Sequence, residues 1–160
     1  MSENTNKTKG EIKQDEKNLS GFYLPAYQVV FLRKVLGTER LPKDDAQVRN
    51  HFVFNILVPV LNKIDLKIAE IRDKYATRLP NGQVKVNPET GIDYGENSEV
   101  SFRAFDDLMK EKVFIHIEDM SLFGHIFGIF FNTNYPMGEE DTTIYNEIVE
   151  VLKAVENPKK

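Results

Sequence analysis

A chain of 160 residues is long enough to bury a proper hydrophobic core, and this length predicts a single domain. The net charge of −4 argues against nucleic-acid binding driven by phosphate neutralisation. The absence of cysteine excludes disulfides, thiol nucleophiles and cysteine-ligated zinc. The longest apolar run, residues 122–131, is too short and too interrupted by glycine to span a membrane. We therefore expect a soluble protein of the cytoplasm or a virion, without a cofactor, that binds neither nucleic acid nor membrane.

Residues 1–20 differ in composition from the rest of the chain. They hold four acidic residues and four lysines, and Ile12 and Leu19 are their sizeable apolar residues. Such a segment cannot offset the entropy cost of its own ordering. We therefore expect a flexible N-terminal arm over residues 1–20 and a single globular domain over residues 21–157. The arm is interpreted either as a dispensable tail or as a segment that becomes ordered on a neighbouring subunit.

The first part of the domain predicts a short extended segment followed by a helix. Residues 21–25 (GFYLP) are a candidate strand. Residues 26–36 have a helical pattern that ends where Gly37 can occupy the C′ position. The side chains expected on the buried side of this helix are Tyr27, Val29, Val30, Leu32 and Leu36.

The stretch from Asp44 to Arg78 predicts one long helix around which the rest of the chain is organised. Asp44 or Asp45 is a natural N-cap. Pro59 removes one helical hydrogen bond and crowds the preceding turn, which predicts a kink of more than roughly 20°. Residues 52–61 are almost continuously apolar, so we expect them to be enclosed on most sides. The apolar residues that recur at helical spacing are Val53, Leu57, Val60, Ile64, Ile68, Ile71 and Tyr75.

Turn residues after the long helix predict a small hairpin and then a further helix. The Pro80-Asn81-Gly82 turn precedes a candidate strand at residues 83–86, and a second turn at residues 87–91 leads to another at residues 92–94. Ser98 is expected to cap a helix that runs to about residue 112. Its side chains at helical spacing are Phe102, Phe105, Leu108 and Met109.

The C-terminal part predicts a strand and a final helix. Residues 113–118 alternate cleanly, with Val113, Ile115 and Ile117 on one face. Residues 120–131 are ambiguous between a helix and a strand, and residues 141–155 predict the last helix. The expected fold is therefore α+β: a long kinked central helix packed with shorter helices, plus a small antiparallel hairpin and an additional strand.

Three segments follow one another in the middle of the chain: a helix ending in EIRDKYATR, the turn segment LPNGQVKVNPETG, and a helix F-x-x-L-M-K-E-K that runs into VFIHI. In this layout the chain resembles an uncharacterised family of small proteins encoded in tailed-bacteriophage genomes. The resemblance covers roughly residues 60–117. The long polar N-terminus and the phenylalanine-rich segment near the C-terminus depart from it. The family has no established active residues, so the resemblance implies a setting in a virion or its assembly and no site.

His116, Glu118 and Asp119 form the best candidate for metal binding or acid–base chemistry. On a strand, His116 and Glu118 share a face, and a third ligand would come from His125 or Asp106. The spacing matches no known zinc pattern, which favours a solvent-facing strand edge. His51, at the start of the long helix, is interpreted as a packed or capping histidine.

Aromatic side chains are concentrated between residues 113 and 135. They are interpreted either as core packing against the long helix or as a surface that binds a partner, because exposed aromatic patches mark interfaces. Together with the apolar residues of the arm, the candidate partner-binding residues are Ile12, Leu19, Phe123, Phe127, Phe130, Phe131 and Tyr135.

The sequence therefore favours a non-enzymatic structural or adaptor protein, a bacteriophage virion or assembly component that acts through protein–protein contacts. Its partners would be other protein subunits, in a homo- or hetero-oligomer. Two alternatives remain open. One is a small regulatory or inhibitor protein that binds a host partner, and the other is an enzyme built around His116, Glu118 and Asp119.

Overall fold

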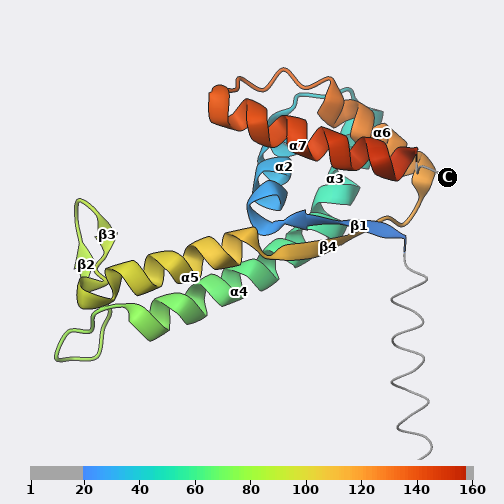
Figure 1. The fold of residues 1–160 in the computed structure, drawn as a ribbon. Helices are drawn as coiled ribbons and strands as arrows, with labels where there is room; N and C mark the ends of the chain where they lie inside the picture. The colour runs from blue at the N-terminus through green and yellow to red at the C-terminus, as the bar shows by residue number, and fades with distance from the viewer. Residues whose placement is uncertain (1–19, 158–160) are drawn as a thin grey trace, which may run out of the picture.

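The computed structural model describes residues 20–157, and the fold is α+β and mostly helical, as expected. Figure 1 shows a body of helices around a two-stranded sheet, from which a pair of helices projects. No helix among residues 20–157 is both long and apolar enough to cross a membrane. The expected flexible arm, with Ile12 and Leu19, lies outside the described residues except for Ser20. The elements are β1 (Gly21–Pro25), α2 (Ala26–Thr38), α3 (Lys43–Phe52), the π-helix η1 (Val53–Leu57), α4 (Val58–Tyr75), β2 (Val86–Asn87), β3 (Gly91–Ile92), the 3-10 helix η2 (Gly95–Asn97), α5 (Ser98–Lys110), β4 (Lys112–His116), α6 (Met120–Phe131) and α7 (Glu139–Glu156).

The sheet of the body joins two strands that are distant in sequence. Strands β1 and β4 pair in antiparallel register, with Gly21 opposite His116 and Pro25 opposite Lys112. Phe22 and Ile115 are paired and both are buried, so the inner face of the sheet closes the core. The strand predicted over residues 113–118 is confirmed, although its ladder begins one residue earlier and ends at His116.

Gly21 is required where β1 begins, because the two strands approach closely there. A Cβ atom at this position would lie 2.3 Å from Cζ of Phe114 and 2.4 Å from the carbonyl oxygen of Ile115. Both separations are far below van der Waals contact, and the second involves backbone that cannot turn aside. The absence of a side chain at Gly21 therefore lets the start of the described chain lie directly against β4.

The predicted long helix is confirmed as the continuous run α3–η1–α4, but its ends differ from those expected. It begins at Lys43 after Pro42, so neither Asp44 nor Asp45 is the N-cap. Both aspartates lie in the first turn, where their charge suits the positive end of the helix dipole. The helix ends at Tyr75, because Ala76 adopts an extended backbone and Arg78 pairs with Val84 in a β-bridge.

The irregularity expected at Pro59 takes the form of a π-helical turn. The backbone N–H of Val58 donates to the carbonyl oxygen of Val53, five residues back. Pro59 has no N–H to continue the regular pattern, and a wider turn before it is one known way for a helix to accommodate such a break. Residues 52–61 are less enclosed than expected, because Phe54 is 59% exposed.

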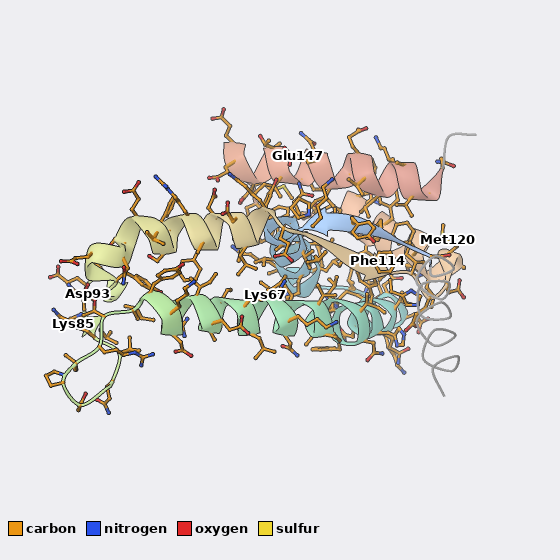
Figure 2. The ribbon with its side chains drawn as sticks, turned by 60° about the horizontal axis from the view of Figure 1, so that its bottom comes forward. Lys67, Lys85, Asp93, Phe114, Met120 and Glu147 are labelled. Carbon is orange, nitrogen blue, oxygen red and sulfur yellow. The ribbon has the colours of Figure 1, made fainter. Side chains whose placement is uncertain are left out.

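Beyond the body, α4 packs against α5, and the two form a projecting helix pair that ends in the β2–β3 hairpin (Figures 1 and 2). Nζ of Lys67 lies 2.8 Å from Oε1 of Glu111 and joins the two helices. Near the tip, Nζ of Lys85 lies 3.4 Å from Oδ2 of Asp93. The predicted hairpin is confirmed, with a shorter ladder than expected.

Two helices expose apolar side chains that belong to their helical apolar patterns, and one of them, Val30, was expected to be buried. Phe102 of α5 is 71% exposed, because α5 meets α4 through the side that carries Ser101 and Leu108. Val30 of α2 is also exposed, whereas Phe31 and Val35 are buried.

Two predicted helix ends also differ in the structure. Gly37 lies inside α2, which continues to Thr38, so Gly37 is not a C′ residue. At the start of α5, the N-cap is Asn97, and the hydroxyl of Ser98 donates to the carbonyl of Gly95.

The ambiguous segment 120–131 is a helix, α6, and α7 begins two residues earlier than expected. Helix α7 buries Ile148 and Leu152 in the core. Nε2 of Gln28, a buried polar side chain of α2, donates to Oε2 of Glu147 on α7 at 2.7 Å. This hydrogen bond satisfies the amide inside the core and fixes α7 across α2.

The burial along the long helix predicts unequal effects for two leucine truncations. Leu57 is fully buried, so Leu57→Ala is expected to lower the free energy of unfolding by about 2–5 kcal/mol. Leu66 lies on the same long helix and is 66% exposed, so Leu66→Ala is expected to stay within about 0.5 kcal/mol. Urea denaturation of both variants measures the difference. Equal losses would show that the buried face of the helix is assigned wrongly.

Candidate functional site

An apolar pocket of about 230 Å³ lies between the long helix and α6. It forms where α3 and η1 face the first turns of α6 across the end of β4. An apolar cavity of about 150 Å³ holds a benzene molecule, so this volume suits one large apolar side chain or a small apolar molecule. The apolar side chains that line it most deeply are Phe52, Ile56, Ile117, Phe123 and Ile126.

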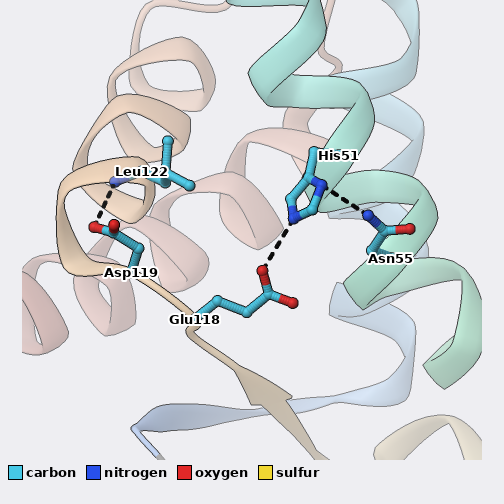
Figure 3. Close-up of polar contacts among 5 residues, drawn as sticks. All are labelled: His51, Asn55, Glu118, Asp119 and Leu122. Carbon is cyan, nitrogen blue, oxygen red and sulfur yellow. Dashed lines mark hydrogen bonds and ion pairs between the residues drawn. The ribbon is translucent and has the colours of Figure 1, made fainter.

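The polar rim of the pocket is organised by His51. Its Nε2 lies 3.0 Å from Oε2 of Glu118, and its Nδ1 lies 2.7 Å from Nδ2 of Asn55 (Figure 3). An amide nitrogen only donates, so in this arrangement Nδ1 accepts from Asn55 while Nε2 faces Glu118. The side chains of His51 and Glu118 are about half exposed, so their contact orients the rim and adds little stability.

Asn55 reaches His51 from the π-helical turn. The two residues are four apart, and Asn55 belongs to η1 whereas His51 belongs to the last turn of α3. π-helical turns inside α-helices are frequent at functional sites. The break before Pro59 and the polar rim of the pocket therefore occupy the same stretch of the long helix.

The three residues expected to form a metal or acid–base site make separate contacts. Oδ1 of Asp119 accepts from the backbone N–H of Ser121 at 2.7 Å and caps α6. Figure 3 shows its longer contact, to the backbone N–H of Leu122 at 3.4 Å. Nδ1 of His116 lies 3.2 Å from the carbonyl oxygen of Ser20, and Glu118 faces His51.

The proposed third ligands lie elsewhere. Nε2 of His125 is 2.5 Å from Oδ1 of Asp45, and Asp106 pairs with Lys110 at 2.8 Å. Within residues 20–157, no three histidine or acidic side chains gather as a metal site.

The aromatic segment divides between core and surface. Phe123 is 4% exposed and packs on Phe22, and Phe130 is fully buried against Tyr145. Their assignment to an exposed partner-binding surface is therefore corrected, because Phe130 has no exposed side-chain surface and Phe123 keeps only a little, inside the pocket. Phe127 and Tyr135 are partly buried against the core.

Phe131 is 48% exposed and is the aromatic residue of this segment that remains available on the body. The hydroxyl of Tyr145 donates to the backbone carbonyl of Phe131 at 2.7 Å. Burial raises the pKa of this hydroxyl above its ordinary value. The contact fixes the end of α6 against α7. It involves the backbone carbonyl of Phe131 and not its ring.

Sequence reasoning missed the pairing of His51 with Glu118. His51 is a half-exposed rim residue and not the packed or capping histidine that was expected. One local signal was present, because Asn55 interrupts an otherwise apolar run four residues later. The partner, Glu118, is 67 positions away, and no local pattern connects the two.

The capping role of Asp119 leads to a stability prediction. Asp119→Ala removes the acceptor for the first turn of α6 and is expected to cost about 0.5–2 kcal/mol of unfolding free energy. Asp119→Asn keeps an acceptor oxygen of the same reach, so most of that loss should be absent. Denaturation curves of the two variants compare them directly. If Asn is as damaging as Ala, the carboxylate acts through its charge and not as a cap.

No protein-family model, curated protein or solved structure matches this chain. No relative's activity is therefore available for transfer to the pocket or to the projecting helix pair.

Proposed function

We propose that the protein is a non-enzymatic structural or adaptor protein that works through contacts with other protein subunits. The observation that carries the proposal is the projecting helix pair, α4 and α5, which extends away from the body in Figure 1. Beyond its junction with the body, where both helices contact α2, it presents most of its surface to solvent.

The helix pair contributes little to the core. Within residues 58–75 the buried side chain is Ile64, and within residues 98–110 the buried residues are Ser101 and Leu108. Fixing the backbone of each residue costs about 1–2 kcal/mol of conformational entropy, and a projection with so narrow a buried stripe recovers little of that through burial. A binding role for its outer surface accounts for the presence of such an element.

The outer surface of the helix pair carries large apolar side chains. Leu66 is 66% exposed and Phe102 is 71% exposed, and Val100 is also exposed. Aromatic residues are frequent energetic centres of protein interfaces, which makes Phe102 the expected anchor. Phe131 is another exposed aromatic residue, and it lies on the body. It therefore serves as the control for Phe102 in tests of where the partner binds.

The resemblance to small tailed-bacteriophage proteins supports a virion or its assembly as the setting for these contacts. An inhibitor of a host protein in the cytoplasm would use the same surface. Unlike a virion component, such an inhibitor would not be present in many copies in a particle. The separate contacts of His116, Glu118 and Asp119 favour the adaptor over an enzyme built on those residues.

Site-specific photo-crosslinking tests which surface meets the partner. A photoreactive residue is introduced at position 102, or at position 131 as the matched control, in cells that make the protein naturally. We expect position 102 to crosslink to one defined subunit, either a second copy or another protein. The variant Phe102→Ser, with an unchanged melting temperature, is expected to lose that partner in co-purification, whereas Phe131→Ser keeps it.

The other outcomes decide against the proposal in two ways. A crosslink at position 131 alone, with loss of the partner in Phe131→Ser, would move the interface from the helix pair to the body. Absence of a specific crosslink at both positions would remove the adaptor function.

A further inference from the structure

We propose that the apolar pocket binds a small organic amine, whose apolar body lies inside while its ammonium group stays at the rim beside Glu118. The site is on the body of the protein, so the proposal is independent of the projecting helix pair and of the partner proposed there. It rests on the lining of the pocket, on its size and on the charges around its mouth.

The interior of the pocket is built from hydrocarbon side chains of separate elements. Phe52 and Ile56 come from the long helix, Ile117 follows β4, and Phe123 and Ile126 come from α6. All five are buried, and their side chains carry no polar atom, so an apolar group is stabilised among them. The volume of about 230 Å³ exceeds the roughly 150 Å³ of a cavity that holds benzene, so a six-carbon ring with a short substituent fits.

The polar side chains of the pocket lie at its mouth. Among those that line it, Gln47, His51, Glu118 and Asp119 are exposed and His116 is half-buried. The described residues of the lining include two carboxylates and neither a lysine nor an arginine. With the histidines neutral, a negative ligand group would meet only negative charge there. The mouth therefore favours a cation over an anion.

Glu118 is the carboxylate that is placed to hold the ammonium group. Its Oε2 lies 3.0 Å from Nε2 of His51, which Asn55 holds from the other side (Figure 3). Within residues 20–157, its Oε1 has no hydrogen-bond partner, and no lysine or arginine pairs with this carboxylate. Asp119 differs, because its Oδ1 already accepts two backbone N–H groups at the start of α6. An ammonium group beside Glu118 would therefore gain a charge-assisted hydrogen bond without breaking the cap of α6.

The shape of the site limits the class of amine. An ammonium group has three donors, and the side chains of the interior offer no acceptor, so the charged end of the ligand must stay at the mouth. A ligand with polar groups at both ends is excluded, because its inner group would be buried without a partner among Phe52, Phe123 and Ile126. The expected ligand is a primary amine close to an aromatic ring or a branched aliphatic group.

NMR titration of the full chain with three matched probes tests the site. At pH 8, benzylamine is a cation, benzyl alcohol is neutral and benzoate is an anion, and all three carry the same ring. Benzylamine is expected to shift the methyl signals of Ile117 and Ile126, and benzoate is expected to leave them unchanged. Benzylamine should bind roughly tenfold more tightly than benzyl alcohol, because a hydrogen bond to a charged group is worth about that factor. Equal binding of these two, or no shift with benzylamine, would overturn the proposal.

Two matched substitutions test the role of Glu118. Glu118→Gln keeps the length of the side chain and removes its charge, so it is expected to lower the affinity for benzylamine about tenfold and to leave that for benzyl alcohol unchanged. Glu150→Gln makes the same change at an exposed position of α7 outside the pocket lining and should alter neither affinity. Equal weakening in both variants would mean that the amine responds to the net charge of the protein, which contradicts a site at Glu118.

Blocking the mouth tests where the ring binds. Leu122 lines the pocket and is 39% exposed, so Leu122→Trp should fill the mouth and abolish the shifts caused by benzylamine and benzyl alcohol. Leu66→Trp adds the same ring on the helix pair and should leave both sets of shifts intact. Dispersed spectra without a probe show that each variant is folded. Unchanged binding to folded Leu122→Trp would place the ring outside the pocket and refute the proposal.

Discussion

The missing backbone N–H of Pro59 is the constraint on which the rest of the structure depends. A proline in the middle of a regular helix would break it, yet the chain continues as one helix of 33 residues from Lys43 to Tyr75. The wider hydrogen bond from Val58 to Val53 makes this continuity possible. At about 1.5 Å per residue, the helix is roughly 50 Å long, so it spans the body and carries the projecting helix pair beyond it.

A single helix that serves both regions gives them different stabilities. Its first part packs among α2, α6 and the end of β4, whereas its second part packs mainly against α5. Local unfolding free energies follow the density of buried contacts. The body is therefore expected to be the cooperative unit, and the outer helix pair can adjust to a partner while Leu57 and its neighbours stay packed.

Local patterns in the sequence predict which helices and strands form, but they do not predict which side of each helix or strand is buried. The long helix, the hairpin and the strand at β4 follow from spacing, turn residues and alternation. Phe102 recurs at helical spacing and is nevertheless exposed, because spacing alone does not identify which apolar stripe meets the neighbouring helix. The sequence left Phe123 and Phe130 open between core and interface, because aromatic content alone does not separate the two. The His51–Glu118 contact depends on the packing of α3 against the end of β4, which no local pattern contains.

The pocket and the start of β1 lie together for a topological reason. Strand β4 ends at His116, and Asp119 starts α6 three residues later, so α6 must turn back beside α3 and leaves an apolar recess between them. The same end of β4 pairs with Gly21, where the N-terminal arm joins the body. One strand end therefore sets both the wall of the recess and the position of the start of β1. This shared origin means that movement of β4 would displace the pocket and the start of β1 together.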